Sequence, residues 1–201
     1  PTALAMVERL TRPLLERHPN LSVTVWSRTS QEIRAMIDGL EADAGITYLE
    51  GEPLGRLERG PLYRERYLLV SSARSDLAGR DSVTWAGVAA RPLSLLTTDM
   101  QNRRILNQHM AEAGAVAAPR LASNSVLVLI SHVRAGAWET ILPHATAGLF
   151  RAEADLLTLP IVAPDASHLM GLVAEPREPH TPVTSALIAA AETLGRELLA
   201  E

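Results

Sequence analysis

The chain has 201 residues, a length that suits one globular domain or two small lobes. Its 47% of hydrophobic and 21% of charged residues exclude a disordered tail, and the absence of cysteine excludes disulfides and thiolate chemistry. The net charge is −4 and all 19 basic residues are arginine, so the chain lacks lysine chemistry and the basic face of a nucleic-acid-binding module. Neither a leader peptide nor a run of 18 apolar residues is evident, and we expect a cytoplasmic protein without a membrane span.

Hydrophobic periodicity predicts an alternation of helices and strands in the first part of the chain. The predicted elements are a helix over 3–17, a strand over 21–27, a helix over 30–40, and strands over 44–49 and 62–71. Pro13 falls inside the first helix and is expected to kink or restart it. Thr29 and Glu32 have the spacing of a capping box at the start of the second helix, with Ser30 as the rival cap.

The same alternation continues to the end of the chain. The predicted elements are a helix over 84–88, a strand over 93–97, a helix over 102–113, a strand over 119–123, a helix to Val133 capped by Asn124 and Ser125, strands over 137–142, 155–159 and 168–174, and a helix from Pro182 to about Leu199. Such an order is typical of an α/β fold. Two expected crossings of the chain predict a lobe I of residues 1–72 plus 165–201 and a lobe II of residues 73–164, with a ligand cleft between them.

Five stretches, in the right order and at the right intervals, resemble the effector-binding domain of LysR-type transcriptional regulators. They are Leu14–Val25, Thr29–Ile33 with Ile37–Leu40, Ala42–Ile46, Leu62–Val70, and Val133–Gly136 with Ile141–Pro143. The resemblance implies two Rossmann-like lobes similar to type II periplasmic binding proteins, with a small and often anionic effector in the interlobe cleft. It also implies a homodimer or homotetramer without a cofactor, which contacts DNA only through an N-terminal winged helix–turn–helix domain that this chain does not contain.

Hydroxyl and amide side chains that follow predicted strands are the candidate effector contacts. The candidates are Thr29, Ser30, Thr98, Asn124, Ser125 and Trp138. For most of them helix capping or turn formation is the competing interpretation, since these residue types are favoured there in any case. Trp138 stands where the resembled family has a glycine, and the next apolar position is Glu139. The indole is therefore expected either in the wall of the cleft or in the core.

Sequence motifs of enzymes are missing. The six histidines are isolated from one another, so we expect no metal site, and neither a Gly-x-Ser-x-Gly elbow nor a Gly-x-Gly-x-x-Gly loop occurs. We therefore expect no catalytic residues. Arg103 and Arg104 begin a predicted helix, where positive charge is mildly unfavourable, which invites either an anion or a surface ion pair. The alternative function is the solute-binding protein of a transporter, which has the same architecture but needs export.

Overall fold

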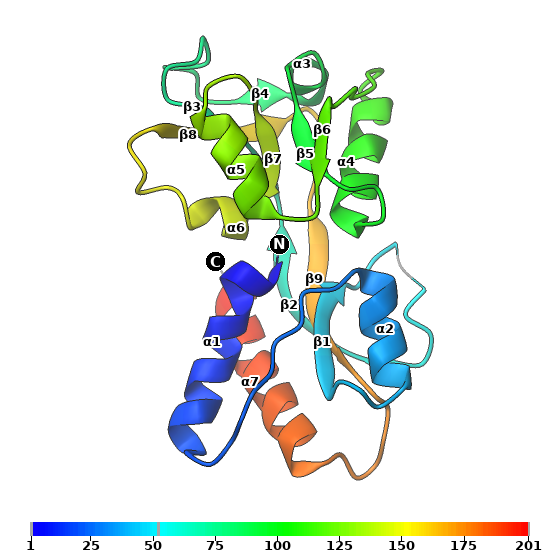
Figure 1. Ribbon diagram of the computed structural model, residues 1–201. Coiled ribbons are helices and arrows are strands. Elements are labelled where there is room, and N and C mark those ends of the chain that lie inside the picture. The colour runs from blue at the N-terminus through cyan, green and yellow to red at the C-terminus, as the bar shows by residue number, and fades with distance from the viewer. Residues whose placement is uncertain (1, 52, 201) are drawn as a thin grey trace. The chain divides into compact units, whose positions relative to one another are not determined.

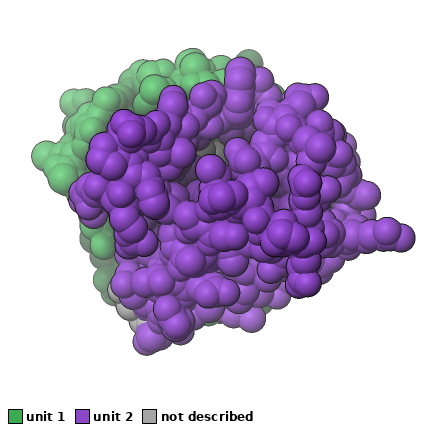
Figure 2. Space-filling view, turned by 90° about the horizontal axis from the view of Figure 1, so that it is seen from below, with its two compact units in different colours: residues 1, 66–167 green, residues 2–65, 168–201 purple. Residues whose placement is uncertain are grey.

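The computed structural model describes residues 2–51 and 53–200 (Figure 1), and the chain divides into two compact units. Unit 1 contains residues 66–167, and unit 2 contains residues 2–65 and 168–201 (Figure 2). The boundaries of these units lie at 65/66 and 167/168, whereas the sequence-based lobes were bounded at 72/73 and 164/165. The residues just after Glu65 belong to unit 1 because they pair with strands of that unit. The extent of the ligand-binding lobes stays a prediction.

Unit 2 is a three-stranded antiparallel sheet with helices packed on it. Its elements are α1 (Thr2–Arg17), α2 (Ser30–Asp38), β1 (Ala44–Tyr48), β2 (Glu58–Glu65), β9 (His168–Ala174) and α7 (Pro182–Leu199), with the strand order β1-β9-β2. Helix α7 lies against β2, and the approach requires Gly195, because a Cβ atom there would collide with the backbone oxygen of Pro61. One core cluster lies between α2 and the sheet and includes Ile37 and Val173.

Local signals in the sequence of unit 2 correctly predicted two helix starts. The Thr29 hydroxyl accepts a hydrogen bond from the Glu32 backbone N–H while the Glu32 carboxylate accepts one from the Thr29 N–H, which is a complete capping box. The Thr181 hydroxyl caps α7 by accepting a hydrogen bond from the Thr184 N–H, with proline at the first helical position. Helix α1 extends over the whole predicted range with Pro13 inside it.

The predicted strand over 21–27 is wrong. Residues 21–29 form no strand, and Val23, Val25 and Trp26 are 39%, 51% and 55% exposed. In the described part of the chain, β1 pairs only with β9, and no backbone hydrogen bond joins residues 22–28 to a neighbouring strand. Alternation of apolar and polar residues shows that a segment suits a half-buried strand, but a strand also needs a partner for its backbone groups.

Unit 1 contains two small sheets with helices around them. Its elements are β3 (Tyr67–Ser72), β4 (Val83–Thr84), α3 (Trp85–Ala89), β5 (Ser94–Leu96), α4 (Gln101–Glu112), β6 (Leu121–Ser123), α5 (Val126–Arg134), β7 (Thr140–Pro143), α6 (His144–Gly148) and β8 (Leu156–Val162). The strand order is β4-β8-β3-β7 in one sheet, and β5 and β6 form a parallel pair that an isolated bridge from Leu93 to Glu139 links to β7. The core between α5 and the sheets is aliphatic and centres on Leu129, Val133 and Leu142.

Three further predictions need correction in this region. The strand predicted over 62–71 is interrupted at Arg66, because β2 pairs with β9 and β3 pairs with β7 and β8. The strand predicted over 137–142 begins only at Thr140, and a short helix that was not predicted follows it from His144. Strand β8 extends to Val162, beyond the predicted end of this strand at residue 159, and so includes part of the segment that was expected to cross between the lobes.

None of the described helices combines the length and the apolar run that a bilayer span needs.

Candidate functional site

The start of α2 carries the two candidate residues of unit 2. Thr29 uses its hydroxyl within the capping box, where it also donates to the Glu32 carboxylate over 2.8 Å. Ser30 is half-buried and borders a surface hollow of unit 2. The hollow is also lined by Gln31, Arg34, Ala35, Asp38, Pro53 and Leu54. Ser30 is therefore better placed than Thr29 to contact a bound molecule.

Three candidate residues of unit 1 lie at one edge of the β5–β6 pair. The register sets Leu96 opposite Ser123 in two parallel strands. The residues that follow, Thr98 on one side and Asn124 with Ser125 on the other, are therefore brought to the same edge, as expected for the carboxyl ends of parallel strands. Thr98 and Asn124 are exposed and Ser125 is half-buried.

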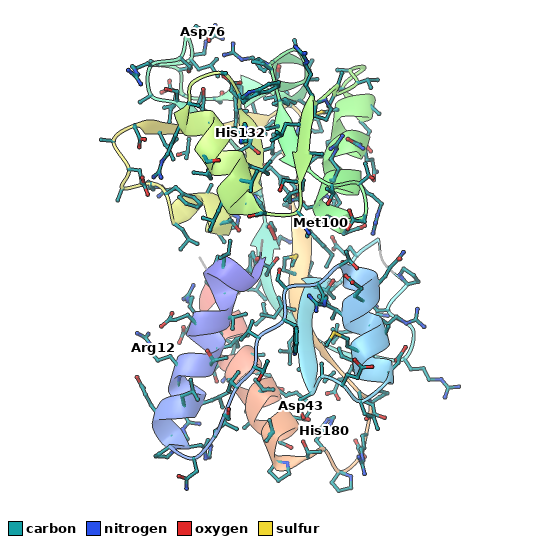
Figure 3. The ribbon with its side chains drawn as sticks, viewed as in Figure 1. Arg12, Asp43, Asp76, Met100, His132 and His180 are labelled. Atoms are coloured by element: carbon teal, nitrogen blue, oxygen red, sulfur yellow. The ribbon has the colours of Figure 1, made fainter. Side chains whose placement is uncertain are left out.

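Two helices begin at this edge without a side-chain cap. Helix α4 starts after Met100 (labelled in Figure 3) and helix α5 starts after Ser125, and neither of these N-cap residues bonds a helix N–H through its side chain. The side-chain cap predicted from Asn124 and Ser125 is therefore wrong, because the N-cap residue Ser125 makes no capping hydrogen bond with its side chain. The helix nevertheless begins where it was expected. Free N–H groups at a helix start attract anions, because the partial positive charge of the helix lies there.

Trp138 is half-buried, and the next residue, Glu139, belongs to a buried network of hydrogen bonds in unit 1. The Glu139 carboxylate accepts hydrogen bonds from the Arg91 Nε and Nη2 atoms over 2.9 and 2.6 Å, and from the Ser71 hydroxyl over 2.9 Å. Arg91 also binds Asp76 with two hydrogen bonds, and this contact lowers the pKa of the Asp76 carboxyl. The acidic residue at an otherwise apolar family position thus has a structural role that its sequence neighbours did not reveal.

A buried carboxyl lies at the end of β2 in unit 2, at a position that the sequence did not predict to be buried. Glu65 is completely buried, and burial raises its pKa from 4.5 to about 8 against the opposing effect of a hydrogen bond from the Tyr63 hydroxyl. Its Oε1 atom has no partner among the described residues. The Thr47 hydroxyl, near the end of β1, is likewise buried and unpartnered. Glu65 lies within the stretch Leu62–Val70 that resembles the family and Thr47 lies in none of these stretches, but no sequence signal indicated that either side chain is buried.

Within residues 2–51 and 53–200, no group of three histidine, aspartate or glutamate side chains is arranged to hold a metal ion. Comparison with known families gives a match over residues 1–195 to the model described as LysR substrate binding domain. No curated protein matches the chain.

Solved structures with the same fold include three regulatory or effector-binding domains. The reduced OxyR regulatory domain from Pseudomonas aeruginosa is 16% identical, with a TM-score of 0.81, and 95% of this chain and 92% of that one are covered. The effector binding domain of QuiR in complex with shikimate is 17% identical (TM-score 0.81; 98% and 94% covered). The regulatory domain of CcmR from Synechocystis PCC6803 in complex with 2-PG is 15% identical (TM-score 0.83; 98% and 95% covered). At these identities the likeness shows a common fold.

Proposed function

This chain belongs to the family of LysR substrate-binding domains, whose members are regulatory rather than catalytic, and we propose that it senses a small anionic metabolite. The effector binds in the interlobe cleft that the family resemblance predicts, with contacts from Thr29, Ser30, Thr98, Asn124, Ser125 and Trp138. Binding is transmitted through a homodimer or homotetramer to a DNA-binding domain of the cytoplasmic regulator. Such transmission requires that the effector bind one assembly state more tightly than the other.

The observation that carries this proposal is the set of polar groups at the edge of unit 1 where β5 and β6 end. Two helices begin there without side-chain caps, next to hydroxyl and amide side chains. The backbone N–H groups of the helix starts, the hydroxyls and the side-chain amide can all donate hydrogen bonds to an oxyanion. Together they form a polar surface at the carboxyl ends of the strands, where α/β sheets bind ligands. Support for a small ligand comes from QuiR, described with shikimate, and CcmR, described with 2-PG. Shikimate is a carboxylate, which agrees with an anionic effector.

Effector binding, rather than thiol oxidation, supplies the signal in this proposal. The similar OxyR domain is described in a reduced form, but none of the 201 residues of this chain is cysteine. The chain therefore has no group that forms a disulfide or a sulfenic acid.

The homodimer is proposed to cover apolar side chains that the single chain exposes. Val25 and Trp26 are more than half exposed in the extended segment of unit 2, and Leu127 is 64% exposed on α5 of unit 1. Contiguous exposed apolar surface is typical of protein interfaces, and Val25 and Trp26 are adjacent in the chain. A second copy is the partner that the family resemblance implies, and symmetric dimers are the most common assemblies of soluble proteins.

Calorimetric titration with a panel of small carboxylates and phosphate esters tests the proposed function. Once a binder is found, Ser30→Ala and Thr98→Ala are expected to weaken its affinity, because each removes a hydroxyl from a predicted contact. Ser185→Ala is the matched control, since it removes an exposed hydroxyl near the start of α7, remote from the candidate residues in sequence. If both Ser30→Ala and Thr98→Ala bind the metabolite as tightly as the unaltered chain, the assignment of these residues is wrong.

A further inference from the structure

Two titratable residues are paired where the chain leaves unit 2 and where it returns. Glu65 ends β2 and His168 begins β9, and they are direct partners in the antiparallel register of these neighbouring strands (Figure 1). Unit 1 contains residues 66–167, so one residue of the pair adjoins each crossing. Directly opposed residues of an antiparallel pair lie on the same face, with Cβ atoms roughly 5 Å apart. One cross-strand pair therefore ends the sheet of unit 2 at both crossings.

The Glu65 carboxyl lacks the partners that an ionised carboxylate needs. It is completely buried, its Oε2 atom accepts a hydrogen bond from the Tyr63 hydroxyl, and its Oε1 atom has no partner among the described residues. Helix α7 packs on β2, but the charged residues of this helix are all exposed, namely Glu192, Arg196 and Glu197. A buried carboxylate without a cation is far more costly than a buried neutral acid. The geometry therefore favours the protonated form of Glu65, and the raised pKa agrees with it.

His168 can supply the donor that a carboxylate at position 65 requires. Its ring is half-buried and lies edge-on to Tyr48 of β1, with 6.2 Å between the ring centroids. The sequence of β9 contains no other titratable side chain. An imidazole has an N–H donor in its neutral form as well as in its charged form. The pair thus has two possible arrangements, which differ by one proton on Glu65.

Contacts within unit 1 hold the chain next to both crossings. The Arg66 N–H donates to the His144 Nδ1 atom over 3.1 Å, and the Arg66 carbonyl accepts from the His144 N–H over 2.8 Å. The buried indole of Trp85 lies edge-on to Tyr67, with 6.0 Å between the ring centroids, and its N–H donates to the Pro164 carbonyl over 3.1 Å. Trp85 therefore contacts the chain just after the first crossing and shortly before the second, so its fluorescence reports on both.

We propose that Glu65 and His168 form a pH-sensitive switch at the two crossings of the chain. With a proton on Glu65, the neutral acid stays buried against Tyr63. When rising pH removes this proton to solvent, the carboxylate turns to accept a hydrogen bond from the His168 ring N–H, and the adjoining segments 66–67 and 164–167 change conformation with the pair. The proton biases this end of the β2–β9 ladder directly. The inference therefore does not depend on the proposed function, and no effector is needed to test it.

Trp85 fluorescence of the whole chain carrying Trp26→Phe and Trp138→Phe tests the switch, because Trp85 is then the only tryptophan. Between pH 5.5 and 9.5 under native conditions, we expect a step in the emission maximum with a midpoint of about 8. Glu65→Gln cannot ionise, and His168→Phe keeps a ring beside Tyr48 but has no N–H, so each is expected to abolish the step. The matched controls Glu192→Gln and His18→Phe replace exposed residues and are expected to retain it.

The His168 ring signals in nuclear magnetic resonance spectra give a second measurement. In the unaltered chain they are expected to show an inflection at the same midpoint, which is absent from Glu65→Gln. The His109 ring lies 5.1 Å from the Trp85 ring between centroids, and any emission step of its own is recognised because Glu65→Gln retains it.

Glu65→Gln keeps the shape of the side chain and the acceptor for Tyr63, so it is expected to fold, and far-ultraviolet circular dichroism checks this at each pH. Three results would each overturn the proposal. They are no emission step near pH 8, a step near pH 8 that survives Glu65→Gln, and a step that is lost in Glu65→Gln but retained in a folded His168→Phe variant. His168→Gln replaces the last variant if the phenylalanine does not fold.

Discussion

Replacement of Glu65 by glutamine is predicted to stabilise the protein, and more strongly as the pH rises. Glu65 is completely buried, its Oε2 atom accepts a hydrogen bond from the Tyr63 hydroxyl over 3.2 Å, and its Oε1 atom has no partner among the described residues. Burial favours the neutral acid and raises the pKa to about 8. Glutamine has nearly the same shape and cannot ionise, so it removes the cost of deprotonation and still accepts the tyrosine hydrogen bond.

The size of the effect follows from the difference between the folded and unfolded pKa values. A rise from 4.5 to about 8 means that the folded chain holds the proton more tightly than the unfolded chain. The stabilisation from the protonated form is complete below pH 4.5 and is lost as the pH rises through about 8. Relative to the unaltered chain, Glu65→Gln is therefore expected to gain on the order of 1 kcal/mol at pH 5 and on the order of 4 to 5 kcal/mol at pH 8.5.

Urea denaturation of both proteins at a series of pH values between 4.5 and 9 measures this difference. Glu192→Gln is the control, because Glu192 is exposed on α7 and its replacement should leave the pH dependence of stability unchanged. A free-energy difference between Glu65→Gln and the unaltered chain that stays constant over this pH range would refute the reasoning, since it would mean that Glu65 titrates alike in the folded and unfolded states.

Three further predictions concern stability and assembly. Arg91→Met is expected to cost about 3 to 5 kcal/mol in urea denaturation because it leaves Glu139 buried without its cation, and adding Glu139→Leu should recover part of the loss. Gly195→Ala should lower the melting temperature despite a helix-propensity gain of about 1 kcal/mol, whereas Gly148→Ala, whose Cβ meets nothing within 4 Å, should not. Trp26→Ser should weaken self-association in sedimentation velocity; an unchanged dimer would exclude this residue from the interface.

Features that depend on adjacent residues were predictable from the sequence. The two residues of the capping box, Thr29 and Glu32, are three positions apart, and the start of α7 is set by a capping threonine followed by proline. Both were read correctly because the interacting groups are neighbours in the chain. The alternation of helix and strand and the family membership were also predictable, since each depends on patterns that are repeated over many residues.

Features that depend on distant partners were not predictable. The segment over 21–27 alternates like a strand, but no other strand pairs with it in the described part of the chain. Arg91 and Glu139 are 48 residues apart, so their ion pair leaves no local pattern.

The central claim, that this chain is a ligand-sensing domain, is tested most directly by thermal unfolding of the 201-residue chain against a panel of small carboxylates and phosphate esters. A true effector at a hundred times its Kd adds about 2.7 kcal/mol to the stability of the folded state. For a chain of this length we therefore predict a rise in Tm of about 5 to 10 °C for at least one compound, reproduced by calorimetric titration. A panel in which no compound raises the Tm or gives a saturable heat of binding would contradict the account.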